Sequence, residues 1–265
     1  MSAVRFAYAT LVSSPDYVLG ATALARSLHA VESKAPLLAL CTDTAFDVAD
    51  LERAGAQPLH VAPPALSDEF RQRHSRKAIH AAAPFTKGNK PAFHDPLNNF
   101  AKLCLWQLTD CERIVFLDAD TLVIKNIDRL FGYPEFSAAP NLYESLDDMH
   151  RLNSGVFVAE PSTATYERML AVLDAPDAYW RRTDQTFLET FFPAWHGLPY
   201  TFNALQYVYF NLPALWRWDS INVVHYQYEK PWQADNPKAD LLRDLIGLWH
   251  QVLETGEIPA LPQRP

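Results

Sequence analysis

Two aspartates at the end of an apolar run give the clearest chemical signal in the sequence. Residues 114–117, Ile-Val-Phe-Leu, are followed by Asp118, Ala119 and Asp120. A short apolar run of this kind is typical of a central strand that is covered on both faces. Two neighbouring carboxylates raise each other's pKa unless a cation neutralises them, and Mg²⁺ or Mn²⁺ binds such oxygen ligands. The pattern indicates a divalent-metal site, with two solvated turn residues as the alternative.

Two kinds of metal-phosphate chemistry use a strand that ends in two aspartates. In aspartate-dependent phosphatases the first aspartate is the nucleophile, and Thr or Val stands two positions past the second, where this chain has Leu122. In transferases that use sugar nucleotides, an Asp-x-Asp pair holds a metal on the donor diphosphate and lies midway along the nucleotide-binding domain. The mid-chain position of Asp118 and Asp120 favours the transferase, with the phosphatase as the alternative.

The elements that must position these carboxylates are recognisable in the N-terminal part. Five segments alternate between strand and helix patterns: 4–10, 17–30, 37–41, 47–54 and 58–61. Alternation at this spacing predicts an α/β fold with a mostly parallel sheet flanked by helices. Ligands of such sheets bind outside the carboxyl ends of the strands, so residues 10–17 and 41–44 should face the same site as Asp118.

The remainder of the chain is less regular. We expect further helices and strands at 98–109, 113–117, 136–139, 155–159, 162–174, 184–192, 221–225 and 237–253. Prolines and basic residues at 62–97 predict a long connection with one short helix around 68–82, either a surface excursion or a flap over an anionic ligand. His74, His80 and His94 in this connection lack metal-ligand spacing, and we expect them to be ordinary surface residues. We interpret 1–265 as a single domain, with a nucleotide-binding half (about 1–125), an acceptor- and metal-completing half (about 126–235) and a C-terminal helix (about 237–253).

Composition and charge exclude several classes of protein. The chain has 265 residues, 49% of them hydrophobic and 20% charged, which fits a globular protein. Its net charge of −8 gives no global attraction for nucleic acid, and its 8 glycines argue against a glycine-rich phosphate loop. Three cysteines without metal spacing fit a reducing compartment. With no targeting segment and no apolar run long enough for a membrane span, we expect a cytoplasmic protein.

Several segments together resemble the glycogenin and galactinol synthase group of family 8 retaining glycosyltransferases. In family order they are Tyr8-Ala-Thr-Leu11 with Tyr17 and Gly20, Phe100-Ala-Lys102-Leu-Cys-Leu-Trp106, Val115-Phe-Leu-Asp118-Ala-Asp120-Thr-Leu-Val123, Asn126-Ile-Asp128-Arg-Leu-Phe131, Asn153-Ser-Gly155-Val-Phe-Val158, Asp184-Gln185, Phe202-Asn203, and His225 with Lys230-Pro231-Trp232. The likeness covers residues 4–232 and implies a GT-A type nucleotide-sugar transferase fold.

The resemblance also implies a role for each matching residue. Asp118, Asp120 and His225 would bind a divalent cation, Mn²⁺ or Mg²⁺, and Lys102 and Lys230 would approach the donor diphosphate. The other implied positions are Leu11, Ser13 and Tyr17 at the uracil and ribose of UDP, Ala119 between the aspartates, Asn153, Ser154, Asp184 and Gln185 around the sugar, and Asn203 on the acceptor side. Of these, we expect Asp184, Gln185 and Lys230 to carry the catalysis.

The sequence thus predicts a metal-dependent retaining hexosyltransferase. The donor would be UDP-glucose, UDP-galactose or UDP-GlcNAc, and the acceptor a carbohydrate or small hydroxylated molecule. The sequence leaves open whether the protein forms a homodimer. Arg181 stands where glycogenin has an aspartate three residues before its Asp-Gln pair, so glycogenin's recognition of the donor-sugar hydroxyls does not carry over. The alternatives are an aspartate-dependent phosphatase and a non-catalytic sugar-nucleotide-binding protein.

Overall fold

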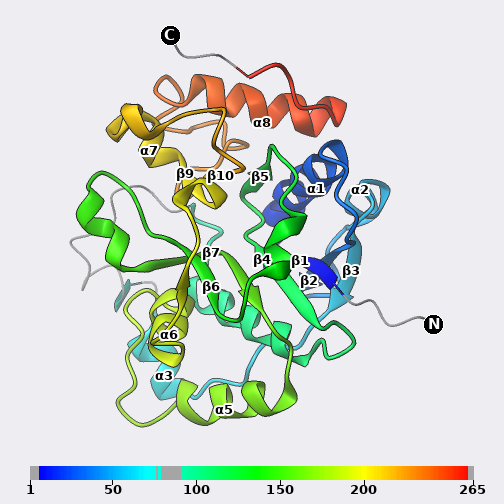
Figure 1. The fold of residues 1–265 in the computed structure, drawn as a ribbon. Helices are drawn as coiled ribbons and strands as arrows, with labels where there is room; N and C mark the ends of the chain where they lie inside the picture. The colour runs from blue at the N-terminus through cyan, green and yellow to red at the C-terminus, as the bar shows by residue number, and fades with distance from the viewer. Residues whose placement is uncertain (1–5, 76, 79–90, 262–265) are drawn as a thin grey trace.

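A sheet of seven strands forms the centre of the molecule in the computed structural model, which describes residues 6–75, 77–78 and 91–261 (Figure 1). The strand order is β3-β2-β1-β4-β7-β6-β8. The bounds are β1 Phe6–Val12, β2 Leu37–Cys41, β3 Gln57–His60, β4 Arg113–Leu117, β6 Ser137–Pro140, β7 Leu152–Ala159 and β8 His196–Gly197. β3, β2, β1 and β4 run parallel, whereas β7 runs antiparallel to β4 and β6. The expected α/β class with a mostly parallel sheet is confirmed.

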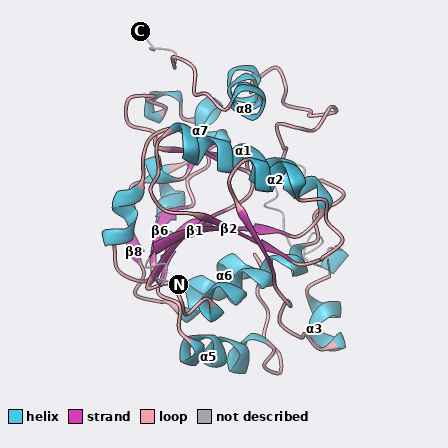
Figure 2. Ribbon diagram, turned by 90° about the vertical axis from the view of Figure 1, so that its right-hand side faces the viewer, coloured by secondary structure: helices cyan, strands magenta, loops and turns pink. Residues whose placement is uncertain are grey.

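Helices cover both faces of this sheet (Figure 2). One face carries α1 Pro15–Ala30 and α2 Ala49–Arg53, and the other carries α3 Asp68–Arg73, the 3₁₀ helix η1 Pro96–Gln107, α5 Thr163–Leu173 and α6 Asp184–Phe191. Side chains of β1 contribute to the apolar cores on both faces of the sheet, because successive side chains of a strand point to opposite faces. Ala7, Ala9 and Leu11 pack towards α3 and α6, whereas Tyr8 and Val12 pack towards α1.

A second, three-stranded sheet lies beside the first. It consists of β5 Thr121–Val123, β10 Val223–His225 and β9 Ala204–Leu205, and it packs with α7 Gln206–Asn211 and α8 Arg243–Thr255. Four 3₁₀ helices connect these elements: η2 Asp128–Gly132, η3 Leu146–His150, η4 Tyr200–Phe202 and η5 Pro213–Leu215. β10 pairs antiparallel with β5, the strand that directly follows Asp120. His225 therefore reaches the aspartates from the second sheet.

Most expected elements occur within a few residues of their predicted bounds, and three differ. The segment 98–109 is a 3₁₀ helix, the C-terminal helix begins at Arg243 instead of Pro237, and α3 ends at Arg73. His74, just past the end of α3, was expected on the surface but is buried: its Nδ1 lies 3.0 Å from the Phe70 carbonyl, and its Nε2 accepts from the Trp180 N–H at 2.8 Å. The rest of the predicted connection, at 76 and 79–90, lies outside the described residues.

Two further expectations concern cysteines and membrane spans. Cys41, Cys104 and Cys111 are buried and form no disulfide. In the part of the chain that the structure describes, every helix is too short or too polar to cross a bilayer.

Candidate active site

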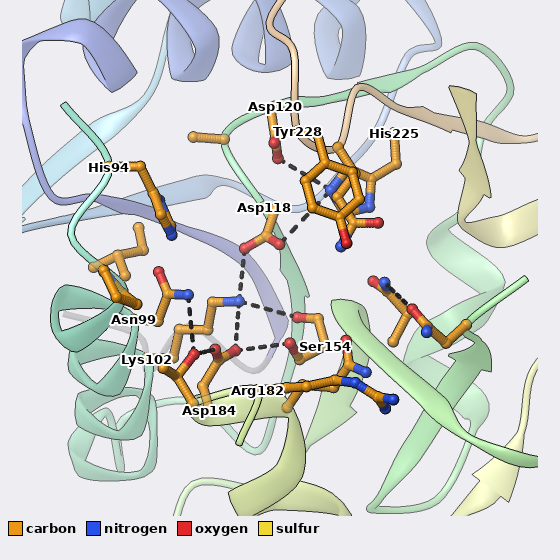
Figure 3. A pocket seen from close by; sticks show the side chains of 18 of the residues that line it. His94, Asn99, Lys102, Asp118, Asp120, Ser154, Arg182, Asp184, His225 and Tyr228 are labelled. Carbon is orange, nitrogen blue, oxygen red and sulfur yellow. Dashed lines mark hydrogen bonds and ion pairs between the residues drawn. The ribbon is translucent and has the colours of Figure 1, made fainter. Parts of the chain in front are cut away.

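One pocket at the carboxyl ends of β1 and β4 collects almost all of the predicted site residues (Figure 3). Its walls include Leu11, Ser13, Tyr17, Lys102, Asp118, Ala119, Asp120, Asn153, Ser154, Asp184, Gln185, His225 and Lys230. Of the residues that the sequence singled out, only Asn203 does not line the pocket, and it lies behind His225. Residues from six segments of the chain thus meet in one place, as the order of strands in an open α/β sheet predicts.

The two aspartates and His225 point their polar atoms at one another. His225 Nε2 lies 3.2 Å from Asp120 Oδ1 and 3.8 Å from Asp118 Oδ2. The backbone fixes both carboxylates: the Asp118 N–H donates to the Gly155 carbonyl at 2.8 Å, and the Tyr226 N–H donates to the Asp120 carbonyl at 2.8 Å. One ligand atom from each of the three side chains lies within 4.8 Å of the others.

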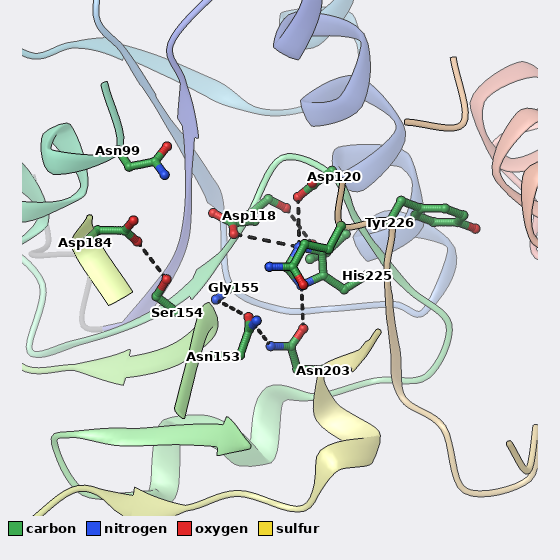
Figure 4. Close-up of polar contacts among 12 residues, drawn as sticks. Asn99, Asp118, Asp120, Asn153, Ser154, Gly155, Asp184, Asn203, His225 and Tyr226 are labelled. Atoms are coloured by element: carbon green, nitrogen blue, oxygen red, sulfur yellow. Dashed lines mark hydrogen bonds and ion pairs between the residues drawn. The ribbon is translucent and has the colours of Figure 1, made fainter. Parts of the chain in front are cut away.

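A chain of hydrogen bonds sets the orientation of the His225 ring (Figure 4). The Gly155 N–H can only donate, so the Asn153 atom 2.8 Å from it is the carbonyl Oδ1. The same Oδ1 accepts from Asn203 Nδ2 at 2.8 Å, which leaves Asn203 Oδ1 to face His225 Nδ1 at 2.8 Å. His225 Nδ1 must therefore carry a proton, and its Nε2 faces the two carboxylates.

This arrangement fits a divalent cation. A cation between the two carboxylates would take the place of a proton on Nε2, so that His225, with Nδ1 donating to Asn203, would direct its Nε2 lone pair at the ion. Two carboxylates and one imidazole form a ligand set suited to Mn²⁺, and Asn203 supplies the partner that a metal-binding histidine commonly has on its other nitrogen. Asp118, Asp120 and His225 are the residues that would hold the ion.

Two glycines allow the close packing around these side chains. A Cβ on Gly155 would lie 2.3 Å from His225 Cε1, and one on Gly20 would lie 2.5 Å from the Ala119 carbonyl. Real Cβ atoms do not approach other atoms so closely. The glycines at these positions are needed because the imidazole rests on β7 and α1 rests on the turn between the aspartates.

Two buried lysines neutralise the carboxylates. Lys102 Nζ lies 2.8 Å from Asp118 Oδ1 and 2.9 Å from Asp184 Oδ2, and Lys230 Nζ pairs with Asp120 Oδ2. Burial alone would raise the pKa of Asp120, but Lys230 and His225 outweigh it and lower that pKa far below its usual range. For Asp118 burial prevails over the attraction of Lys102, so its pKa is raised. Burial would likewise lower the pKa of Lys102, yet Asp118 and Asp184 raise it.

Asp184 and Gln185 begin helix α6 and face the same pocket. Thr183, just before the helix, has a φ of 51°, which is unusual for a β-branched residue and turns the chain so that Asp184 enters the site. Asp184 Oδ2 also accepts from the Ser154 hydroxyl at 2.7 Å. Burial favours the neutral acid, but the Lys102 ion pair outweighs it and the pKa of Asp184 is lowered. The amide Nε2 of Gln185 is buried and has no hydrogen-bond partner among the described residues.

An aromatic cluster around Tyr17 forms another part of the pocket. The Tyr17 hydroxyl lies 3.1 Å from His94 Nδ1, and the Tyr17 ring packs edge-on against Phe93 and Trp232. His94, expected to be an ordinary surface residue, is half-buried and lines the pocket through its contact with Tyr17.

Several other residues of the pocket carried no signal in the sequence. Beyond the predicted set, further polar and aromatic side chains line the pocket: Asn141, Tyr143, Asp148, Arg151, Arg182, Gln227 and Tyr228. They come from short loops and 3₁₀ segments whose paths depend on long-range packing. The unbroken pair Arg181-Arg182 next to Asp184-Gln185 was the one visible hint.

The fold and the site together define a class. An α/β sheet with an Asp-x-Asp pair at its carboxyl end, completed by a histidine and bounded by lysines, is the GT-A arrangement of glycosyltransferases. The comparison with known families matches residues 9–236 to "Glycosyl transferase family 8", and the chain belongs to that family. The resemblance seen in the sequence is confirmed.

Individual relatives agree with this assignment. UDP-glucuronate:xylan alpha-glucuronosyltransferase 1 of Arabidopsis thaliana is 34% identical over 206 residues, which cover 77% of this chain and 27% of that protein. Glycogenin-1 of Homo sapiens is 35% identical over 183 residues, which cover 61% of this chain and 51% of glycogenin. The chain thus spans between about a quarter and a half of the length of these curated relatives.

Solved structures show the same fold at low sequence identity. The galactosyltransferase LgtC, in complex with donor and acceptor sugar analogs, has a TM-score of 0.61 and 16% identity, covering 96% of this chain and 97% of that one. The glycosyltransferase GlyE of Streptococcus pneumoniae TIGR4 has a TM-score of 0.62 and 13% identity, covering 94% of this chain and 62% of that one.

Proposed function

We propose that the protein is a metal-dependent retaining hexosyltransferase that moves a hexosyl unit from a UDP-sugar to an acceptor hydroxyl. One observation carries the proposal: Asp118, Asp120 and His225 converge in a pocket where Lys102 and Lys230 flank them. A sugar nucleotide needs this combination because its diphosphate becomes more negative as the sugar leaves.

The nucleoside would lie at the aromatic end of the pocket. Tyr17 offers a ring face or edge to the uracil, and Leu11 and Ser13, at the end of β1, offer backbone groups to the base and ribose. From there the diphosphate would reach the aspartates, so that the sugar extends towards Ser154 and Asp184. This orientation is the one that the family resemblance implies for the matching residues.

In the transfer itself, the bond between the anomeric carbon and the β-phosphate oxygen breaks and UDP leaves with the electron pair. A divalent ion, when bound, supplies positive charge at the departing diphosphate. Lys230 adds a second positive charge there. The acceptor oxygen forms its new bond to the anomeric carbon on the face that UDP leaves, and its proton passes to a phosphate oxygen.

Asp184 and Gln185 would act on the sugar. Asp184 is held by Lys102, Ser154 and Thr183, so its carboxylate has a fixed position and stays ionised, as its lowered pKa indicates. The buried Gln185 amide has an unused donor that a sugar oxygen or the reacting face can satisfy. Asn153 would help to shape the part of the pocket that holds the sugar. Asn203, expected on the acceptor side, would affect the acceptor only through its contacts with Asn153 or His225. The acceptor is a carbohydrate or a small hydroxylated molecule.

A UDP-release assay tests the proposal. The purified protein is incubated with Mn²⁺ and, in turn, UDP-glucose, UDP-galactose, UDP-GlcNAc and UDP-glucuronate, the donor named for the Arabidopsis relative, with and without EDTA. We expect release from at least one donor and its loss with EDTA. Binding of UDP without turnover of any donor would support a non-catalytic binder, and phosphate trapped covalently on Asp118 would support a phosphatase. No binding and no release of any donor would overturn the proposal.

A further inference from the structure

Tyr228 lines the pocket with its backbone in an unfavourable conformation. Its φ is 70°, a left-handed value that glycine adopts freely but that crowds the Cβ of a tyrosine. Such strain persists only where the surrounding structure imposes it, and it is concentrated at functional sites. The residue is half-buried in the pocket wall. The fold therefore holds a large aromatic side chain at a point of the pocket where the backbone would suit a glycine better.

The buried side chain of Gln206 imposes this conformation. Its Nε2 donates to the Gln227 carbonyl at 2.6 Å and to the Glu229 carbonyl at 3.1 Å, and these are the carbonyls on either side of Tyr228. Both partners can only accept, so the Gln206 atom between them is the amide nitrogen. Gln206 is only 1% exposed, and releasing the turn would leave its amide buried without partners, which is costly. One amide group thus fixes the turn that carries Tyr228.

Two other tyrosines pack against the Tyr228 ring. Its centroid lies 6.0 Å from that of Tyr143 and 5.5 Å from that of Tyr207. Tyr207 is itself fixed, because its hydroxyl donates to the buried carboxylate of Glu229 at 2.9 Å. The Tyr228 ring is therefore held by packing as well as by its backbone, and it can bind a ligand with little loss of conformational entropy.

The position of Tyr228 suits the acceptor better than the donor. Under the proposed function, the nucleoside lies at Tyr17 and the donor sugar at Asp184. The acceptor attacks on the face that UDP leaves, and therefore lies beside Lys230 and the metal ligands. Tyr228 stands between His225 and Lys230 in the chain, and Figure 3 shows it towards His225 and away from Asp184. A ring at this point borders the space that the acceptor must enter.

We propose that Tyr228 is a specificity residue for the acceptor, against which a ring of the acceptor stacks, and that Gln206 is a positioning residue that acts through it. The inference rests on the proposed function and adds the structural feature by which the acceptor is selected. That feature is a ring with an apolar face, made of C–H groups or of an aryl group, which a tyrosine ring binds well. A linear polyol has the hydroxyls but lacks this face.

The wild-type protein provides the first test. With Mn²⁺ and the donor that gives the fastest UDP release, transfer is measured to the methyl glycosides of glucose, galactose and xylose and to the matching alditols, which have no ring. Benzyl alcohol shows whether an aryl ring suffices. We expect kcat/KM to be at least about tenfold higher for one or more ring-bearing acceptors than for every alditol.

Two results of this test would overturn the inference and leave the donor part of the proposed function standing. One is that alditols react as well as the ring-bearing acceptors, and the other is that no acceptor raises UDP release above the rate in water. If no donor is bound and none is hydrolysed, both the inference and the proposed function fail.

Variants of Tyr228 provide the second test. Tyr228→Gly removes the ring and suits a φ of 70°, so the protein should still unfold cooperatively in urea. The ratio of transfer to hydrolysis should fall at least about tenfold, while the Kd of UDP measured by calorimetry should change less than about threefold. Tyr228→Phe keeps the ring and should keep most of the ratio. An unchanged ratio in Tyr228→Gly, or a loss of UDP affinity as large as the loss of transfer, would overturn the assignment.

The matched control for the backbone is Glu32→Gly. Glu32 is exposed, has a φ of 55° and lies outside the pocket, so this change relieves the same kind of conformation and should leave the ratio of transfer to hydrolysis unchanged.

Gln206→Met tests the positioning role, because methionine has a similar volume but no N–H groups. The ratio of transfer to hydrolysis should fall, though less than in Tyr228→Gly. Since Gln206 acts through the Tyr228 ring, the double variant should have the same ratio as Tyr228→Gly alone. Losses that multiply in the double variant would overturn the positioning role, because they would show that Gln206 acts independently of the ring.

Discussion

The two ends of the central sheet hold carboxylates in opposite ways. At the carboxyl end, Asp118 and Asp120 lie together and share His225. At the amino end, Asp128 stands apart and accepts hydrogen bonds from the hydroxyls of Tyr8 and Ser33, each at 2.7 Å. Burial raises the pKa of Asp118. For Asp128 burial acts in the same direction, but hydrogen bonds led by that from Tyr8 outweigh it and lower the pKa.

The difference separates function from stability. A carboxyl group whose pKa is raised by folding destabilises the folded state while it is ionised, whereas one whose pKa is lowered stabilises it. The carboxyl end therefore holds charge that only a cationic ligand fully compensates, and the amino end holds charge that fastens β1 to η2. Substitutions at the two ends should have opposite consequences for activity and stability.

The largest effect is expected from Asp118→Asn at the carboxyl end. It removes a proposed metal ligand, so UDP release with Mn²⁺ should fall at least about a thousandfold. The free energy of unfolding in EDTA at pH 7, measured with urea, should be unchanged or higher, because an ionised carboxylate with a raised pKa is removed. That stability difference should shrink as the pH is lowered through the raised pKa, where the wild-type carboxyl is itself neutral. Asp240→Asn, at a fully exposed carboxylate, is the control; full activity in Asp118→Asn would break the comparison.

A smaller effect is expected from Gly155→Ala. The new Cβ would meet His225 Cε1 at 2.3 Å and Nδ1 at 2.6 Å, so the ring must move away from its hydrogen bond to Asn203. Because that bond orients the ligand, we expect affinity for Mn²⁺ to fall about ten- to a hundredfold. Manganese binding is measured directly by electron paramagnetic resonance of the free ion.

The matched control for Gly155 is Gly247→Ala in the middle of α8, where nothing lies within 4 Å of an added Cβ. This substitution should leave manganese affinity unchanged and raise the free energy of unfolding by about 0.5–1 kcal/mol, since alanine favours a helix. Equal manganese affinity in Gly155→Ala and the wild type would mean that the position of His225 does not govern the metal site.

At the amino end, Asp128→Asn should lower stability and spare activity. Loss of hydrogen bonds to a charged acceptor should reduce the free energy of unfolding by about 2 kcal/mol at pH 7. Because the folded-state pKa of Asp128 is lowered, its stabilisation is present above the unfolded pKa of about 3.9 and is lost as the pH falls further. Urea titrations at pH 7 and about pH 3 should therefore show a difference between wild type and variant that is smaller in acid. A difference of the same size at both pH values would show that the charge is not responsible.

The carboxyl end could largely be predicted from the sequence, because its chemistry is concentrated in short continuous motifs. Asp118 and Asp120 end a strand whose apolar run is itself informative, and Lys230 follows His225 by only five residues. What could not be predicted is how the chain closes around them. The hydrogen bond from His225 to Asn203, the seating of the ring on Gly155 and the backbone turn at Thr183 all depend on contacts between distant segments.

The amino end shows the opposite limit of sequence reasoning. Asp128 was visible as part of the family segment 126–131, yet nothing local indicated what it does. Its partners Tyr8 and Ser33 lie 120 and 95 residues away along the chain. A motif can therefore be recognised from its residues alone, while its physical role appears only when the register of the strands and the packing of η2 are known.

The smallest expected effect, from Tyr8→Phe, sharpens the comparison. Tyr8 is fully buried, so removing its hydroxyl deletes one hydrogen bond to Asp128 with little change in packing, and we expect a loss of about 1 kcal/mol in the free energy of unfolding. Combined with Asp128→Asn, it forms a double-mutant cycle. If the amino end acts as one network, the double variant should be less destabilised than the sum of the two single variants, by at least about 0.5 kcal/mol. Strict additivity would mean that Ser33 and the backbone hold Asp128 independently of Tyr8. The two ends of the sheet would then differ in a second way, because the charged side chains at the carboxyl end share partners whereas the contacts of Asp128 would act separately.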